Sequence, residues 1–382
     1  MREVINVHVG HTGAGIGEAC WELFCLEHDI SPSGVKDCSL DYCSQFTSFF
    51  SESSNKFTPR AVFTHSDNFQ FKDLCTDNYS TEEQIRKQAE NCSNLQGFIL
   101  YRSIKSESGS QIGSEVLERI REYQKCVFDI SVFPDINGSG AEVVNAILAS
   151  RSADCIFALQ NEAIIDICKR NLDIEQPTLK QVNMIAAHFI SDLTAGMRFD
   201  EYSTQMVELS QYLVPRPRLN TVICSRAPVT SKIAQDLFTS QSISKLACEP
   251  SQYLIRCNTR NTTHFAFKVI YRGDVVPKDV SIFLNHIKGS RTVQFADWCH
   301  TNFGAEINYQ SKIKFFEDSN MTHHERSCIT IQNSTAIAQV WNEIRTKFDR
   351  IQLEKSEDLL NAREDLNILE AEYEEAGQHK DQ

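Results

Sequence analysis

The sequence has 382 residues, of which 41% are hydrophobic, so it is long enough to bury two or three cores. Its formal net charge of −13 at pH 7 argues against a nucleic-acid-binding protein and favours partners with basic surfaces. No stretch predicts a membrane-spanning helix or a secretory signal peptide. The fourteen cysteines therefore predict buried thiols in a reducing compartment, and we expect a cytoplasmic globular protein that does not contact membranes.

The chain opens with a strand, a glycine-rich turn and a helix. Residues 2–9 alternate apolar and polar side chains, and GHTGAGIG follows at residues 10–17. A glycine turn before a helix gathers backbone N–H groups at the positive helix end, which suits a phosphate. The stretch has neither the Gly-Lys-Ser/Thr of a P-loop nor a regular GxGxxG spacing, so a purely structural turn remains the alternative.

Four cysteines near the N-terminus have matching gaps and raise the question of a zinc site. They are Cys20, Cys25, Cys38 and Cys43. Cys20 and Cys25 are five residues apart on one predicted helix and therefore point roughly 140° apart, a poor angle for sharing a metal. We interpret all four as core thiols.

Further strands follow at residues 95–103, 126–134 and 153–161, with helical stretches between them. Strands that alternate with helices predict a doubly wound sheet with its ligand at the strand ends. A dinucleotide oxidoreductase is disfavoured, because that class needs an acidic residue after the second strand and Glu27 lies in a helix.

A long apolar helix is predicted from Pro177 and Thr178, which form a helix start. Apolar side chains recur at helical spacing through Val182, Ile185, Ala186, Phe189, Ile190, Leu193 and Met197. Such a helix is apolar over most of its circumference, so we expect protein to bury it on several sides.

The segment leading into this helix, NEAIIDICKRNLDIEQPT (161–178), resembles that of tubulins nearly residue for residue. The opening, the stretch 198–218 and the stretch 271–310 also resemble tubulins, in the same order. The resemblance implies an α/β tubulin-like fold with internal deletions. Its expected parts are a Rossmann-type, GTPase-like nucleotide-binding domain (1–177), a core helix (178–198), an intermediate α+β domain (199–330) and C-terminal helices (331–382).

The resemblance also implies a GTP site with Mg²⁺, built from turns at the strand ends. The corresponding residues are Gly10, His11, Thr12, Asp67, Ser103, Ser108, Gly109, Ser110, Ser139, Gly140, Glu142, Asn161, Leu179 and Asn183. In the family, the position of Asp67 faces the magnesium, and a hard cation prefers such oxygen ligands. Asn161 and Asn183 stand where the guanine base is recognised, and Leu179 stands where an aromatic ring stacks on that base.

The phosphate loop departs most from the family. The family has GGGTGSG where this chain has KSESGSQ (105–111), and His11 replaces a glutamine. Glu107 places a carboxylate where a phosphate is expected, and two like charges ~4 Å apart cost about 4 kcal/mol at an effective dielectric of ~20. Unless Lys105 offsets this, GTP binds weakly. A non-enzymatic, tubulin-derived binding protein with weak or absent GTP binding is therefore the alternative hypothesis.

Glu208 favours the alpha type, because it aligns with the glutamate that alpha chains direct at the neighbouring subunit's nucleotide. A carboxylate can orient an attacking water and accept its proton. The implied function is a GTP-binding structural subunit of microtubules that pairs head to tail with a beta-type tubulin. A solvated helix glutamate is the alternative interpretation.

The end of the chain predicts two helices. One carries Ile337, Val340, Trp341, Ile344 and Phe348 as an apolar stripe, and the other carries Leu359, Leu366, Leu369 and Tyr373. The second helix is acidic outside, and in tubulins that face meets motors and microtubule-associated proteins. We therefore expect a location in the cytoplasm, on the microtubule cytoskeleton.

Overall fold

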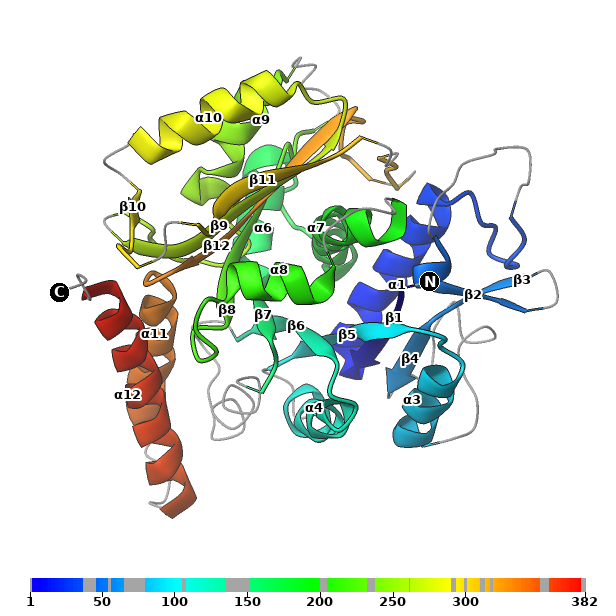
Figure 1. The fold of residues 1–382 in the computed structure, drawn as a ribbon, viewed down its shortest axis with the longest axis horizontal. Coiled ribbons are helices and arrows are strands. Elements are labelled where there is room, and N and C mark those ends of the chain that lie inside the picture. The colour runs from blue at the N-terminus through cyan, green and yellow to red at the C-terminus, as the bar shows by residue number, and fades with distance from the viewer. Residues whose placement is uncertain are drawn as a thin grey trace.

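A ten-stranded sheet forms the centre of the protein in the computed structural model (Figure 1). Its strand order is β10-β9-β12-β8-β7-β6-β5-β1-β4, with β11 paired to β9. The structure describes residues 2–36, 46–53, 56–64, 80–104, 108–134, 152–199, 205–231, 238–260, 262–289, 293–298, 301–309, 313–316, 319–350 and 357–378. The domain boundaries predicted at residues 177, 198 and 330 stay predictions.

The N-terminal half contributes a parallel part of the sheet. Its strands are β1 (Glu3–Val9), β4 (Ala61–Thr64), β5 (Leu95–Ser103), β6 (Cys126–Phe133) and β7 (Cys155–Gln160), and each pairs in parallel with its neighbour. Nearly every residue in these strands is buried, as expected when both faces of a parallel sheet are covered. A separate hairpin joins β2 (Phe50–Ser53) to β3 (Lys56–Pro59).

Helices cover the two faces of this parallel part. One face packs against α1 (Gly10–Glu27) and α7 (Leu179–Phe199), and the other against α3 (Thr81–Glu90), α4 (Gly113–Arg121) and the C-terminal helices. Neighbouring residues in β5 alternate between the two cores, with Phe98 and Leu100 on one face and Ile99 and Tyr101 on the other. This alternation follows from the two-residue period of a strand.

The C-terminal half extends the same sheet. Strand β8 (Thr221–Ala227) runs parallel to β7, and β12 (Arg326–Ser334) lies antiparallel between β8 and β9 (Thr263–Gly273). The short strands β10 (Gln294–Phe295) and β11 (Phe303–Asn308) pair with β9. The helices of this half are α8 (Met206–Leu213), α9 (Ser240–Ala247) and α10 (Pro277–Gly289), with a 3₁₀ turn at Pro250–Gln252.

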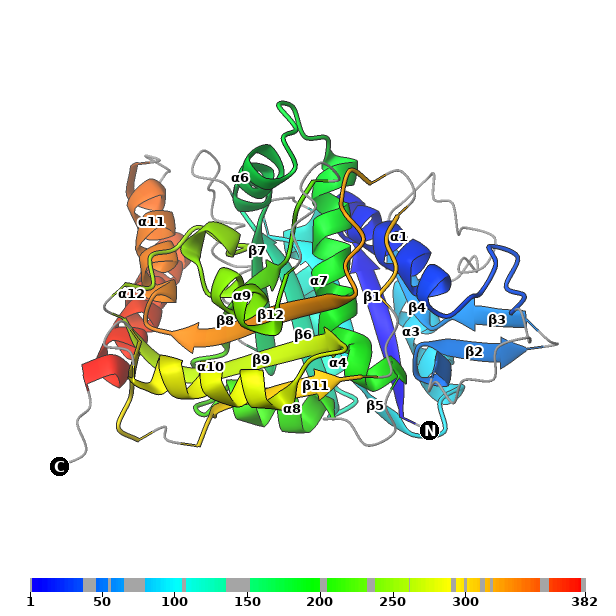
Figure 2. The ribbon, with the colours of Figure 1, turned by 90° about the horizontal axis from the view of Figure 1, so that it is seen from above.

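The predicted core helix is α7, and its 21 residues confirm the expected length. Every residue from Met184 to Phe199 is buried, because α7 lies between α1 and the strands β9 and β12 (Figure 2). Its start differs in detail from the expected cap: the backbone N–H and hydroxyl of Thr178 lie 2.8 and 3.3 Å from Gln181 Oε1, which accepts from both.

Buried ions join α1, α7 and the C-terminal strands. Glu27 accepts from Arg198 at 2.7 Å and from Arg272 at 3.0 Å, and Asp192 accepts from Arg226 at 2.8 Å and from Arg272 at 2.9 Å. All five side chains are at most 2% exposed. We call these five residues the ion cluster. It contains three cations and two anions, so each carboxylate neutralises charge that has no access to water.

The C-terminal helices α11 (Ile337–Arg350) and α12 (Glu357–Gln378) pack on each other and close one end of the molecule (Figure 1). Their predicted apolar stripes are buried at Ile337, Val340, Trp341, Ile344, Leu366, Leu369 and Tyr373. The side chains of Phe348 and Leu359 lie outside the described residues. Within the described part of the chain, no helix is long and apolar enough to cross a membrane.

Candidate nucleotide-binding site

The carboxyl ends of the parallel strands β1, β4, β5, β6 and β7 lie along one edge of the sheet. In an open α/β sheet, ligands bind in the crevice beyond these ends. Ten of the fourteen predicted nucleotide-binding residues lie at or after these strand ends, or near the starts of α6 (Asn161–Asn171) and α7. Asp67, Ser139, Gly140 and Glu142 lie outside the described residues.

The first turn of α1 begins without a side-chain cap from its N-cap residue. Gly10 has a positive φ of 69°, which glycine adopts without steric cost, and the chain passes directly from strand to helix there. Val9 provides no side-chain cap, and the first turn contains no acidic residue. His11 is exposed and Thr12 is partly buried. The helix end therefore retains its partial positive charge, which suits an anion.

Glycines let α1 approach its neighbours closely. A Cβ on Gly13 would lie 2.3 Å from the carbonyl oxygen of Tyr101, so α1 rests directly on β5. A Cβ on Gly15 would lie 2.8 Å from Asn183 Nδ2. The structure thus brings the amide of Asn183, from α7, against the turn that begins at Gly10.

The turn after β5 is a π-helical turn, Ser108–Ile112, that contacts α1 and β1. Ser103, Gly109 and Ser110 are buried there, and Ser114 Oγ donates to the Ser110 carbonyl at 2.6 Å. The side chain of Ser108 lies outside the described residues, as do Lys105 and Glu107. The predicted repulsion between Glu107 and a phosphate therefore stays a prediction.

A buried ion pair, which was not predicted from the sequence, supports this turn. Arg102 and Asp129 are both fully buried and lie 2.8 Å apart. Arg102 Nη1 also donates to Ser114 Oγ at 3.4 Å, which links β5 to the start of α4. Two charged residues inside apolar strands could have revealed the pair, because a buried charge requires a partner.

His8 is a second buried group near the site that the sequence analysis missed. Its ring stacks between Phe63 and Tyr101, with centroids 4.4 and 4.3 Å away, and Trp21 Nε1 donates to His8 Nε2 at 3.1 Å. Burial lowers the pKa of His8 to about 3, although the nearby backbone of Gly13 acts in the opposite direction. His8 is therefore neutral at pH 7, and its ring packs between Phe63 and Tyr101 near the end of β1.

We expect His8 to make the fold sensitive to acid. The unfolded chain protonates this residue below about pH 6.5, whereas the folded protein resists protonation down to about pH 3. Stability is therefore lost as the pH falls from 6.5 towards 3, by about 2 kcal/mol from this group at pH 5. Urea unfolding at pH 7 and pH 5 measures the loss. His8→Gln should show a smaller loss, and the matched variant His286→Gln, at an exposed position, should match the unmodified protein.

Residues predicted to hold the base lie at the starts of two adjoining helices. Asn161 is the first residue of α6 (Asn161–Asn171), directly after β7, and is partly buried. Helix α6 packs on α7, which begins at Leu179 and contains Asn183. The Leu179 side chain is 68% exposed, so its apolar surface is available to a ligand.

The described residues contain no group of three or more His, Cys, Asp or Glu side chains that could hold a metal ion. The predicted magnesium contact, Asp67, lies outside that part of the chain. Cys20 and Cys25 are buried in the core, and burial raises the pKa of Cys25 to about 12, which keeps it a thiol. Their burial agrees with the interpretation as core cysteines.

Glu208 lies at the other end of the parallel strands. It is exposed in the first turn of α8, where its Oε2 accepts from the backbone N–H of Gln205 at 3.2 Å. Helix α8 packs near the starts of β5 and β6: a Cβ on Gly97 would lie 3.2 Å from Met206 Cε, and Ser210 lies beside Cys126. Glu208 is thus remote from its own chain's candidate site and projects from the opposite side.

Two family profiles match most of the chain. Residues 3–81 and 76–169 match the Tubulin/FtsZ family GTPase domain, and residues 217–346 match the tubulin C-terminal domain. The chain belongs to the tubulin family. The predicted tubulin-like α/β fold is confirmed, and the GTPase-domain match includes the first turn of α1, the turn after β5 and Asn161.

Alpha chains of distant organisms are similar to this tubulin along nearly its whole length. It is 35% identical to the tubulin alpha-1 chain of Arabidopsis thaliana, 34% to the tubulin alpha-2 chain of Caenorhabditis elegans and 36% to the tubulin alpha-2B chain of Physarum polycephalum. Each alignment covers 99% of this chain and 97% of the relative. The predicted resemblance to the alpha type is therefore confirmed, and this is a divergent alpha-tubulin-like chain.

Proposed function

We propose that this chain is a GTP-binding structural subunit of cytoplasmic microtubules that pairs with a beta-type tubulin. One observation carries the proposal: the candidate nucleotide site and Glu208 lie at opposite ends of the same parallel strands. Stacking subunits head to tail brings the Glu208 end of one subunit onto the nucleotide end of the next. Such a heterologous contact does not close on itself and therefore builds a filament.

The described residues fit a guanine nucleotide. The N–H groups of Gly10, His11 and Thr12 open a helix that Val9 does not cap, which suits a phosphate, and the turn holding Gly109 and Ser110 lies beside them. Asn161 and Asn183 supply amide donors and acceptors for the base edge, with Leu179 packing on its face. Ser103 is the last residue of β5, and Ser108 directly precedes Gly109 in the turn after this strand. Ser139, Gly140 and Glu142 are the proposed ribose contacts.

Glu208 is the proposed catalytic residue, and it acts in trans. GTP supplies the labile phosphoanhydride bond, and the exposed carboxylate orients the attacking water and accepts its proton. The capping contact with Gln205 leaves the second carboxylate oxygen available for this task. Asp67 would hold Mg²⁺ directly or through water, because a carboxylate oxygen is a ligand that this cation prefers.

The exposed face of α12 is the proposed contact for motors and microtubule-associated proteins. Glu364, Glu374 and Glu375 are exposed on it, and the overall charge of −13 strengthens its field. Such a face steers basic partners by long-range attraction. Nucleic acid, being polyanionic, is disfavoured by the same field.

A second function is favoured by the phosphate loop alone. With Glu107 in that loop, the chain would contact beta-type tubulin but hold little or no GTP. The two functions differ in one measurable quantity, the amount of nucleotide bound to the purified heterodimer.

Purifying the chain with a beta-type partner and counting guanine nucleotide tests this choice. We expect close to two guanine nucleotides per heterodimer, one of which does not exchange. The matched variant Glu107→Gly should retain at least as much nucleotide, because it removes a negative charge near the phosphates. One nucleotide per heterodimer, rising to two with Glu107→Gly, would instead support the second function, in which this chain holds little or no GTP.

A further inference from the structure

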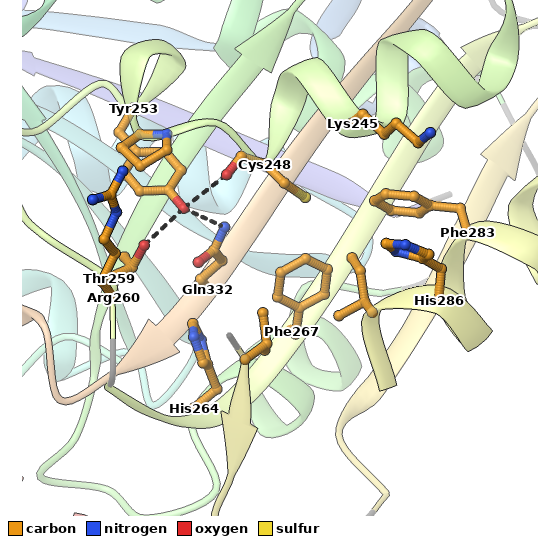
Figure 3. A pocket seen from close by; sticks show the side chains of 13 residues that line it. Lys245, Cys248, Tyr253, Thr259, Arg260, His264, Phe267, Phe283, His286 and Gln332 are labelled. Atoms are coloured by element: carbon orange, nitrogen blue, oxygen red, sulfur yellow. Dashed lines mark hydrogen bonds between the residues drawn. The ribbon is translucent and has the colours of Figure 1, made fainter. Parts of the chain in front are cut away.

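A cavity of about 300 Å³ lies between α9, α10 and β9, on the outer face of the C-terminal half (Figure 3). Its walls come from α9 and its C-cap Cys248, from Phe283 on α10, and from His264 and Phe267 on β9. We call it the β9 pocket. Its volume is at the lower end of the range for small-molecule sites. It shares no residue with the candidate nucleotide site.

The interior of the β9 pocket is apolar and aromatic. The rings of Phe267 and Phe283 face the cavity in Figure 3, and both side chains are at most 5% exposed. On the other side, Tyr253 donates to the Cys248 carbonyl at 3.2 Å, and its hydroxyl lies 3.1 Å from Thr259 Oγ1. These hydrogen bonds hold the polar side chains of the pocket in place without a ligand. Less conformational entropy is therefore lost when a ligand binds.

Cations surround the opening. Lys245 and Arg260 lie on opposite sides of the pocket in Figure 3, and both are exposed at its rim. None of the thirteen described residues that line the cavity is acidic. A rim of this kind is unusual on a chain with a net charge of −13, and it locally favours an anion.

His264 provides a second, independent observation. Its ring is 2% exposed, lines the pocket, and has an Nδ1 atom with no hydrogen-bond partner within the described part of the chain. Burial lowers the pKa of His264 to about 4, so the imidazole is neutral at pH 7. A buried polar atom of this kind costs stability as long as it has no partner, and its position in the wall of a cavity indicates space for a bound molecule.

We propose that the β9 pocket binds a small aromatic carboxylate. The ring system enters between Phe267 and Phe283, and the carboxylate stays at the rim, where Lys245 and Arg260 attract it. Offset or edge-to-face contacts with the two phenyl rings favour an aromatic body over an aliphatic one. Among the residues that line the pocket, the anion meets positively charged groups and no carboxylate.

Calorimetric titration of the purified full-length chain with 2-naphthoate tests the proposal, with neutral 2-naphthamide as the comparison ligand. We expect one saturable site with a Kd of about 1 mM or tighter, and binding of 2-naphthamide at least about fivefold weaker. Cys248→Phe fills the cavity and should abolish binding of both ligands. The exposed double variant Lys245→Gln with Arg260→Gln leaves the core intact and should reduce the affinity for 2-naphthoate to that for 2-naphthamide.

Lys169→Gln, on the exposed surface of α6, is the matched control and should bind 2-naphthoate like the unmodified chain. The absence of saturable heat at millimolar 2-naphthoate would overturn the proposal. Equal affinity for the two ligands would overturn the role of the rim cations. An unchanged affinity in a folded Cys248→Phe variant would show that the ligand binds elsewhere.

Discussion

Replacing Asp192 with asparagine should destabilise the protein by about 3–5 kcal/mol. Asp192 accepts from both Arg226 and Arg272, and Ser327 Oγ also donates to it at 3.0 Å. Without its charge, the ion cluster holds three buried guanidinium groups against the single carboxylate of Glu27. The buried cations then lose Coulombic compensation while remaining out of water, which is the costliest outcome for an ion pair. Urea unfolding at pH 7 measures the loss as a lower transition midpoint.

The exposed pair formed by Arg256 and Asp166 provides the matched control. Its ions lie 2.6 Å apart, but their side chains are 42% and 46% exposed. Asp166→Asn should therefore cost less than about 1 kcal/mol. Combining Asp192→Asn with Arg226→Gln removes one cation together with the anion and should recover part of the stability. Equal losses at Asp192 and Asp166 would contradict the view that burial makes the ion cluster essential.

The ion cluster also marks the limit of what sequence could predict. Periodicity located α7, because its apolar residues recur along one continuous segment and its burial follows from local order. The partners of the cluster are far apart in the chain: Glu27 and Arg272 are separated by 245 residues. No local pattern links them, and only the folded structure brings both α1 and β9 into contact with α7.

The candidate site was more predictable than the cluster, because its residues follow strand ends that share one sheet edge. Gly10 and Asn161 directly follow strand ends and Asn183 packs against Gly15, whereas their roles in nucleotide binding stay predictions. The buried side chains that pack beneath these residues were not predicted from the sequence. Arg102 and His8 each lie within apolar strands, and their partners Asp129 and Trp21 come from other elements. Which of these residues meet depends on how neighbouring elements are aligned with each other, and the sequence does not reveal that alignment.

Removing the carboxylate of Glu208 should slow GTP hydrolysis in a copolymer with beta-type tubulin by about 100-fold or more. Glu208→Ala removes the proposed orienting group, but it also removes the α8 cap, because Glu208 accepts from the Gln205 N–H. Glu208→Gln separates the two effects, since glutamine retains an acceptor for the cap and cannot take a proton. Phosphate release during assembly, normalised to polymer mass, measures the rate.

Both variants should lose hydrolysis, whereas only Glu208→Ala should lower the stability of α8, by about 1 kcal/mol. Glu343→Gln, at an exposed position on α11, is the matched control and should hydrolyse GTP at the unmodified rate. The defect should appear only in polymer, because Glu208 projects from the end opposite its own candidate site and, in the proposed function, acts on the neighbouring subunit's nucleotide. An unchanged rate for Glu208→Gln, in polymer shown to contain the variant chain, would remove Glu208 from catalysis and leave it as a helix cap.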